Sequence, residues 1–193
     1  KYEEAITNYD KVLAINSPDF TLCICALYTN KGLSLDALGK YEEAITNYDK
    51  ALAINSNSSS PYDPSLILNN KGLALDYLGK YEEAITYYDK ALAINASDAD
   101  VVYNKANALY NLGKYEEAIT NYDKALAINS TYIPALNNKG LTLSDLGKYE
   151  EAITNYDKAL AINSNSSSLY DLRLLINKGL ALDYVGKYVE ATT

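Results

Sequence analysis

The chain has 193 residues, a net charge of −8 and no histidine. An acidic surface repels phosphate groups, so these values argue against nucleic acid or an anionic membrane as the main partner. No apolar run approaches the roughly 18 residues of a transmembrane helix, and no signal peptide is recognisable. We therefore expect a cytoplasmic chain without membrane contact.

One stretch recurs along the chain and predicts a helix wherever it stands. It is complete at residues 113–130, where it begins Gly-Lys-Tyr-Glu-Glu-Ala-Ile-Thr-Asn-Tyr-Asp-Lys. Tyr115, Ala118 and Tyr122 recur at steps of three and four residues, which places them on one helical face. The two glutamates fall in the first turn, where the helix dipole favours negative charge. Further copies occupy residues 1–17, 39–56, 79–95, 147–164 and, cut short, 186–193.

The segment before each copy predicts a second kind of helix. Residues 99–112 carry Val102, Ala106 and Leu109 at helical spacing. Asp98 can cap the start of this helix, and Gly113 can end it because glycine readily adopts the left-handed conformation. Two helices joined by a tight Gly-Lys turn form an antiparallel pair. One pair cannot bury its apolar faces alone, so successive pairs must stack.

The spacing of the copies defines the domain organisation. Their first tyrosines lie 39, 40, 34, 34 and 39 residues apart. The basic unit is therefore 34 residues, and three connections, near residues 17–22, 57–62 and 165–170, carry five or six more. We predict one array over residues 1–193, divided into full repeats at 17–56, 57–96, 97–130 and 131–164 and truncated repeats at 1–16 and 165–193.

The truncated repeats leave both ends of the array incomplete. Residues 1–16 are a second helix without a first helix, so we expect the chain to be a fragment of a larger protein. Residues 172–185 are predicted as a first helix that ends at Gly186, with a short stub after it.

The long connections can be interpreted in two ways. They are recognition loops beside a groove or tolerated surface insertions, and we favour insertions because added loop length costs little entropy. Asp19, Asp63 and Asp171 are expected to cap the helices that follow, with Pro64 at a first helical position.

Small residues recur at fixed positions of the 34-residue unit. Each first helix carries one near its middle: Gly32, Gly72, Ala106, Gly140 and Gly179. Each second helix carries an alanine in its first half: Ala44, Ala84, Ala118, Ala152 and Ala191. This period and these positions resemble the tetratricopeptide repeat family. The resemblance covers the whole chain and implies an all-α fold, a right-handed superhelical α-solenoid of stacked antiparallel helix pairs.

The family resemblance also implies a binding site. In this family the first helices line a concave groove that binds extended peptides or partner helices. Here an asparagine recurs in each first helix, similar to the asparagine ladder of some family members: Asn30, Asn70, Asn104, Asn138 and Asn177. An amide offers a donor and an acceptor, so a ladder can pair with a peptide backbone of any sequence. The alternative is that these amides only solvate an open face.

The charge of this groove indicates which ligands suit it. The carboxylates Asp36, Asp76, Asp100, Asp145 and Asp183 are expected on or near it, so it should prefer a neutral or basic peptide. Chaperone-binding family members hold a C-terminal carboxylate with basic residues. At the matching positions this chain has Asn107, Asn138 and Arg173, with Tyr103 and Asn177 where a lysine and an arginine belong.

The predicted groove residues are Asn30, Asn70, Asn104, Asn107, Asn138, Asn177, Asp76, Asp100, Tyr103 and Asp145. A lysine follows each ladder asparagine: Lys31, Lys71, Lys105, Lys139 and Lys178. We expect these lysines to lay their stems over apolar surface and carry the ammonium out to water.

The residue types needed for catalysis are missing. No nucleophile–base pair, phosphate loop or metal cluster is recognisable, and without histidine a Ser–His or Cys–His device is impossible. Cys23 and Cys25 lie two residues apart on a helix, so they point away from each other and are interpreted as packing residues. We predict no enzyme activity, no cofactor and no metal.

Two functions remain open from sequence alone. The first is a protein-interaction scaffold that binds a peptide or partner helix in the groove. The second is a structural spacer or assembly module that associates head to tail, with residues 1–16 of one molecule completing the last repeat of the next.

Overall fold

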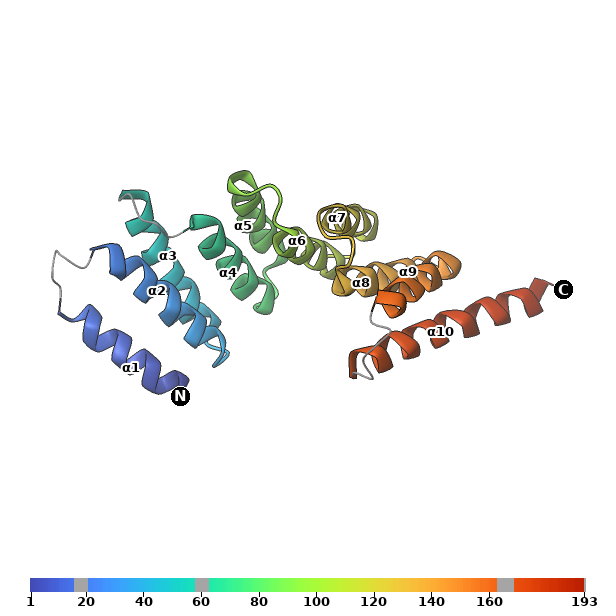
Figure 1. The fold of residues 1–193 in the computed structure, drawn as a ribbon, viewed down its shortest axis with the longest axis horizontal. Coiled ribbons are helices and arrows are strands. Elements are labelled where there is room, and N and C mark those ends of the chain that lie inside the picture. Colours follow the sequence, from blue (N-terminus) through green and yellow to red (C-terminus); the bar gives the residue numbers. More distant parts are fainter. Residues whose placement is uncertain (16–20, 58–62, 163–168, 193) are drawn as a thin grey trace. The chain divides into compact units, whose positions relative to one another are not determined.

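The computed structural model describes residues 1–15, 21–57, 63–162 and 169–192 (Figure 1). In these residues it contains ten helices and no strands, so the predicted all-α fold is confirmed. The helices are α1 Tyr2–Leu13, α2 Thr21–Asp36, α3 Tyr41–Asn57, α4 Pro64–Tyr77, α5 Tyr81–Ile94, α6 Ala99–Asn111, α7 Tyr115–Ile128, α8 Ile133–Asp145, α9 Tyr149–Ile162 and α10 Leu169–Thr192. Among them, none is both long and apolar enough to cross a membrane.

The helices form two compact units, Lys1–Ala96 and Ser97–Thr193. In the first unit α2 packs on α3 and α4 packs on α5, while α3 contacts α4 and α1 contacts α2. In the second unit α6 pairs with α7 and α8 with α9, while α7 contacts α8 and α9 contacts α10. First helices of successive pairs also touch, α2 with α4, α6 with α8 and α8 with α10. Each unit is therefore a stack of helix pairs in which every pair contacts its neighbours in sequence, as in a solenoid.

Four glycines close the turns within the pairs. Gly39, Gly79, Gly113 and Gly147 have φ angles of +73° or +74°. In the third pair Gly113 N–H donates to Tyr110 O at 2.8 Å and Lys114 N–H donates to Leu109 O at 2.9 Å. These bonds satisfy carbonyl groups that would otherwise be unpaired at the end of the first helix, which confirms the predicted glycine turn.

The prediction that the last first helix ends at Gly186 is wrong. α10 continues through Gly186 to Thr192 as one helix of 24 residues. In the other pairs the chain turns back because a full second helix packs against the first. Seven residues follow Gly186 in this chain, too few to bury much apolar surface, whereas continuing the helix adds a backbone hydrogen bond with each residue.

Two of the predicted aspartate caps are confirmed, at the starts of α4 and α6. Asp63 accepts from Ser65 N–H at 2.9 Å ahead of Pro64. Asp98 accepts from the N–H groups of residues 100 and 101 at 3.1 Å. The prediction that Asp171 is an N-cap is wrong, because α10 already begins at Leu169. The reason is that leucine stands in α10 where α4 has Pro64, so nothing forces the helix to start there.

Two other sequence expectations concern small features of the chain. Asp19 and most of the long connections lie outside the described residues. Both cysteines are free; Cys23 is exposed and Cys25 is buried, with its thiol 3.6 Å from Ala51 O. Cys25 therefore packs as a small core residue, whereas Cys23 does not.

A tyrosine on each second helix fits against a small residue on its first helix. Tyr48, Tyr88, Tyr122 and Tyr156 are almost completely buried. A Cβ atom added to Gly140 would lie 2.6 Å from Tyr156 Cε1, and the contacts at Gly32 and Gly72 are equally close. The small residue is thus required because the tyrosine ring occupies the space of a side chain. In the third pair Ala106 stands at this position, and Tyr122 OH donates to Asn107 Oδ1 at 2.7 Å.

Candidate functional site

Side chains from α6, α8 and α10 form a connected set of hydrogen bonds, here called the amide network. Asn138 Nδ2 donates to Asn107 Oδ1 at 2.9 Å and to Tyr103 OH at 3.0 Å. Asn137 Nδ2 donates to Asn138 Oδ1 at 3.0 Å, and Asn177 Nδ2 donates to Asn137 Oδ1 at 3.1 Å. Because the bonds cross between helices, they fix the amides of three successive first helices relative to one another.

The amide network brings together only part of the predicted ladder. Asn138 and Asn177 belong to it, with the predicted groove residues Asn107 and Tyr103. Asn104 lies half-buried on α6, while Asn30 and Asn70 lie in the first unit, where Asn70 is 8% exposed. The role of these residues in binding stays a prediction.

Hydrogen bonds within the network limit what each amide can offer a ligand. Asn138 uses both of its amide protons, so one acceptor site on its oxygen remains. Asn107 Oδ1 already accepts from Asn138 and from Tyr122 OH. Asn177 donates one proton to Asn137 and keeps a second. The sequence could not show this, because spacing identifies a shared face but not hydrogen bonds among the side chains on it.

Two predicted groove carboxylates accept hydrogen bonds from tyrosines of a neighbouring pair. Tyr132 OH donates to Asp100, and Tyr110 OH donates to Asp145 Oδ2 at 2.7 Å. Burial, and then the adjacent carboxylate, raises the pKa of Tyr110 and of Tyr132. Both hydroxyls therefore stay protonated as donors. Tyr103 also lies edge-on to Tyr132, with ring centroids 5.2 Å apart.

The expectation that the lysines carry their ammonium groups to water is wrong for four of them. Each pairs with an aspartate on the preceding second helix: Lys31 with Asp10, Lys71 with Asp49, Lys139 with Asp123 and Lys178 with Asp157. The partners lie 21, 22, 16 and 21 residues apart in sequence. These separations differ only by the five or six extra residues of the long connections. When those extra residues are subtracted, the lysine and its aspartate are always 16 residues apart, so the sequence alone could have predicted the pairing.

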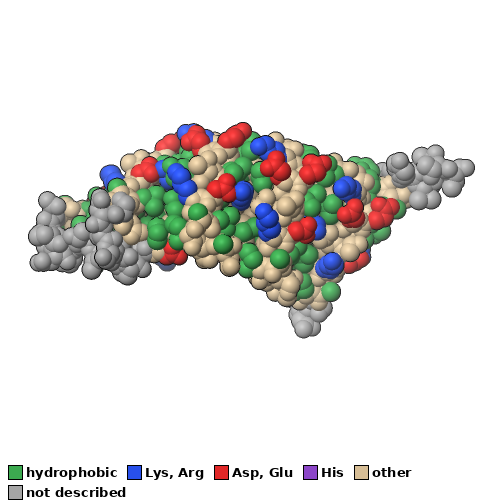
Figure 2. All heavy atoms as spheres, turned by 90° about the horizontal axis from the view of Figure 1, so that it is seen from above, with side chains coloured by type: hydrophobic (Ala, Val, Ile, Leu, Met, Phe, Trp, Pro, Cys, Tyr) green, Lys and Arg blue, Asp and Glu red, His purple; other side chains and the backbone are tan. Residues whose placement is uncertain are grey.

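Lys71 is the most deeply placed of these lysines. Its side chain is 7% exposed, and Nζ donates to Tyr87 OH at 2.9 Å as well as to Asp49. Burial alone would lower the pKa of Lys71, but the hydrogen bonds to Asp49 and Tyr87 outweigh it and raise that pKa. On the face shown in Figure 2, basic side chains lie among acidic ones and gather in no basic patch.

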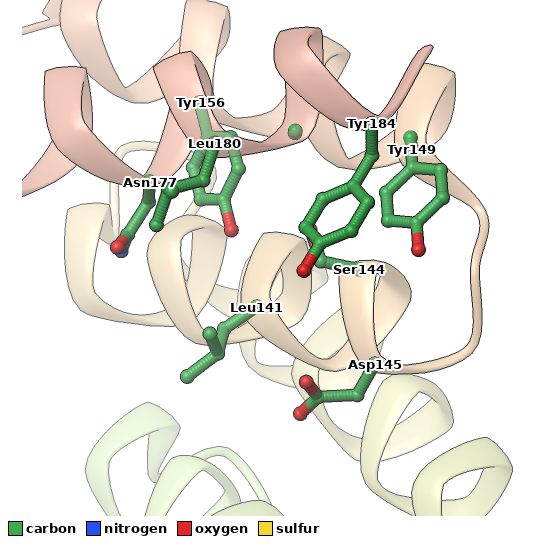
Figure 3. Close-up of a pocket in the computed structure, with 9 residues that line it drawn as sticks. Leu141, Ser144, Asp145, Tyr149, Tyr156, Asn177, Leu180 and Tyr184 are labelled. Atoms are coloured by element: carbon green, nitrogen blue, oxygen red, sulfur yellow. The ribbon is translucent and has the colours of Figure 1, made fainter. Parts of the chain in front are cut away.

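A hollow of about 330 Å³ lies between α8, α9 and α10 in the second unit (Figure 3). Leu141 and Asp145 line it from α8, Tyr156 from α9, and Asn177 and Tyr184 from α10. The ring of Tyr184 stacks on Tyr149 of α9, with centroids 5.0 Å apart and planes at 7°. The hollow therefore borders the amide network at Asn177 and combines apolar walls with one carboxylate.

The described residues offer no group of three His, Cys, Asp or Glu side chains that could hold a metal ion. The amide network, the Tyr132–Asp100 and Tyr110–Asp145 hydrogen bonds and the hollow all lie within the second unit.

Comparison with family models gives two matches. A model described as "Tetratricopeptide repeat" matches residues 23–97 and 131–193, more than half of the chain. A second, described as "Anaphase-promoting complex, cyclosome, subunit 3", matches residues 78–159. No curated protein matches the chain.

Solved structures with a similar fold include three informative cases. BtubC from P. vanneervenii is 19% identical with a TM-score of 0.78, covering 99% of this chain and 84% of that one. YrrB, described as a TPR protein with an unusual peptide-binding site, is 22% identical with a TM-score of 0.69, covering 92% and 84%. The first TPR domain of Spaghetti (RPAP3), bound to the HSP90 peptide SRMEEVD, is 26% identical with a TM-score of 0.58, covering 63% and 93%.

Proposed function

Because the chain belongs to the tetratricopeptide repeat family, we propose that it is a non-enzymatic scaffold that binds an extended peptide or partner helix along its first helices. The observation that carries this proposal is the amide network across α6, α8 and α10. Polar side chains that are already held in place lose little freedom when a ligand binds, and this favours affinity. Two proteins with a similar fold, RPAP3 and YrrB, are described as peptide binders, which supports the proposal.

The remaining hydrogen-bonding capacity of the network suits a peptide backbone. Asn177 keeps an amide proton for a backbone carbonyl, and Asn138 keeps an acceptor site for a backbone N–H. Backbone recognition of this kind is independent of the ligand's sequence. Selectivity then depends on the side chains around the network.

The charges around the network favour a neutral or basic ligand. Asp100 and Asp145 carry negative charge on the faces of α6 and α8. The RPAP3 ligand SRMEEVD is acidic, and here Asn107 and Asn138 occupy positions where chaperone-binding members have basic residues. We therefore expect an acidic C-terminal tail to bind more weakly than a basic peptide, with added salt reducing the difference.

The test is selection of binders from a random peptide library displayed on phage, followed by calorimetry with the full 193-residue chain. Asn138→Ala should weaken a selected peptide by about five- to thirty-fold, the effect of one or two hydrogen bonds. The matched control is Asn155→Ala, which removes an amide that donates to Glu151 O within its own helix α9. Equal affinities for the two variants, with both folded, would contradict a role of the network in binding.

A second candidate is an assembly module, favoured by the open face of α10. Leu172, Leu175 and Ile176 are about half exposed. Gly179 stands where Gly32, Gly72 and Gly140 each receive a tyrosine ring, yet no described residue comes within 4 Å of a Cβ added there. α1 carries Tyr9 at the position of those buried tyrosines, and none of its residues is buried.

In this second candidate, α1 of one molecule covers α10 of another, with Tyr9 seated over Gly179. Light scattering over a concentration series should then show association that Tyr9→Ala or Gly179→Leu abolishes. A strict monomer at the highest concentration would contradict head-to-tail assembly.

Our proposal also includes the repeat division given above, a protein or peptide as the partner and a cytoplasmic location.

A further inference from the structure

The hollow between α8, α9 and α10 is large enough to admit a side chain of a ligand. Its volume of about 330 Å³ is at the lower end of the roughly 300–1,000 Å³ of small-ligand sites. It borders the proposed peptide path at Asn177, which belongs to both the amide network and the wall of the hollow. A peptide lying on the network can therefore direct a side chain into it.

The walls of the hollow suit a long side chain with an apolar stem. Leu141, Leu180 and Ala181 supply aliphatic surface, and Leu180 is 56% exposed, so its apolar surface is available to a ligand. The stacked rings of Tyr149 and Tyr184 supply a flat aromatic surface (Figure 3). Such a ring attracts a cation over its face.

One carboxylate at the edge of the hollow determines the charge that it accepts. Asp145 is exposed and accepts from Tyr110 OH through Oδ2 only, and it forms no ion pair with any described residue. In contrast, Asp123 and Asp157 of the same unit are paired with lysines. The negative charge of Asp145 is therefore uncompensated next to an aromatic wall.

The carboxylate is not a requirement of the repeat. Asp145 stands five residues after Gly140, and the corresponding residues of the first two pairs are Ala37, directly after α2, and Tyr77 of α4. The first unit contains an equivalent ring stack, Tyr41 on Tyr77, with centroids 5.0 Å apart. The stack thus recurs, whereas the carboxylate beside it is particular to α8.

We infer that this hollow binds the arginine side chain of a peptide ligand, with its stem along Leu141 and Leu180 and its guanidinium between Asp145 and the Tyr184 ring. The inference rests on the proposed function, since the peptide backbone lies on the amide network. Arginine is favoured over lysine because a planar guanidinium stacks on a ring and pairs with a carboxylate through two N–H groups.

The test titrates the full chain with three short peptides while amide and tyrosine NMR signals are recorded. The probes are Ac-Gly-Gly-Xaa-Gly-Gly-NH2 with arginine, lysine or citrulline, the neutral isostere of arginine. We expect the arginine peptide to shift the signals of Asn177, Leu180 and Tyr184, and to bind at least five-fold more tightly than the citrulline peptide. The lysine peptide should bind between the two.

Two variants test whether Asp145 causes the preference for arginine over citrulline. Asp145→Asn keeps an acceptor for Tyr110 OH but removes the charge, and it should abolish the preference of arginine over citrulline. Glu150→Gln removes an exposed carboxylate of α9 and should leave that preference intact. The inference would be overturned if the arginine and citrulline peptides bound equally well, or if Asp145→Asn left the preference for arginine unchanged. It would also be overturned if millimolar probe caused no shifts, or shifts confined to other residues.

The library selection separates this inference from the function on which it rests. Selected peptides that bind through Asn138 but tolerate citrulline in place of arginine would overturn the arginine site and leave the scaffold proposal standing. A library that yields no binder to the network, together with arginine-specific shifts at Tyr184, would overturn the scaffold proposal and leave a cation site in the hollow.

Discussion

Replacing Asp36 with asparagine should stabilise the chain at neutral pH. Asp36 lies half-buried at the end of α2, where Oδ2 accepts from Tyr48 OH. Its other oxygen, Oδ1, is buried without a hydrogen-bond partner among the described residues. Burial raises the pKa of Asp36 from 3.8 to about 6, although the hydrogen bond from Tyr48 acts in the opposite direction. The folded chain thus holds an ionised carboxylate at pH 7 at a cost that a neutral amide avoids.

The size and sign of the effect follow from this raised pKa. A rise from 3.8 to about 6 corresponds to at most about 3 kcal/mol, at roughly 1.4 kcal/mol for each pKa unit. Since Asp36 is only partly buried, solvent screening reduces this to about 1–2 kcal/mol. The folded state binds the proton more tightly than the unfolded state, so the stabilising contribution is complete below about pH 4 and is lost as the pH rises through about 6.

The assay is urea unfolding followed by circular dichroism between pH 4 and pH 7.5. The free energy of unfolding of Asp36→Asn minus that of the parent should increase across this range and level off above about pH 6.5. The control is Glu43→Gln, which removes an exposed carboxylate from α3 and should show no such rise. A pH-independent difference, or an Asp36→Asn variant less stable than the parent at pH 7, would refute the burial argument.

Five further substitutions test three contacts by the same unfolding assay. Gly140→Leu should cost about 1–3 kcal/mol because Tyr156 occupies the space of the new side chain, whereas Gly140→Ala should cost clearly less, since Ala106 stands at the same position of the third pair. Asp98→Ala should cost about 1 kcal/mol, because the carboxylate caps two N–H groups of α6. Asp49→Ala should destabilise more than Lys71→Met, because it leaves a buried ammonium without its carboxylate. Equal losses for Gly140→Leu and Gly140→Ala, equal losses for Asp49→Ala and Lys71→Met, or no loss for Asp98→Ala would contradict the contact concerned.

Most of the fold could be predicted because each repeat gives the same local signals. The glycine after each first helix and the aspartate caps at Asp63 and Asp98 depend on residues that are adjacent in sequence. Two predictions for α10 were wrong, its end at Gly186 and its cap at Asp171. In both cases a recurring residue is present, but the neighbouring feature that accompanies it in other repeats is missing. Gly186 has no full second helix to follow it, and the start of α10 lacks the proline of α4.

The candidate site was less predictable, for a different physical reason. Helical spacing predicts Asn138, Asn177 and Asp145 on one face. In the structure Asn137 bonds to both Asn138 and Asn177, and Asn177 and Asp145 line the same hollow. Helical spacing does not reveal that amides of neighbouring helices bond to one another and so have fewer groups left for a ligand. Nor does spacing reveal a hollow, which depends on the angles between three helices.

Two recurring contacts explain how the repeats can differ without losing their arrangement. Within a pair, the small residue and its tyrosine are always 16 residues apart, as in Gly32 and Tyr48 or Gly140 and Tyr156. Between pairs, a lysine meets an aspartate across connections of either length, as in Lys139 with Asp123 and Lys178 with Asp157.

Because the second contact survives five or six added residues, the helices rather than the connections determine how neighbouring pairs meet. Positions outside both contacts are therefore free to vary from repeat to repeat. Asp145 and its counterpart Ala37 occupy such a position, and a tyrosine stack recurs in both units. We expect partner selectivity to depend on positions of this kind, because changing them alters the surface without disturbing the stack beneath it.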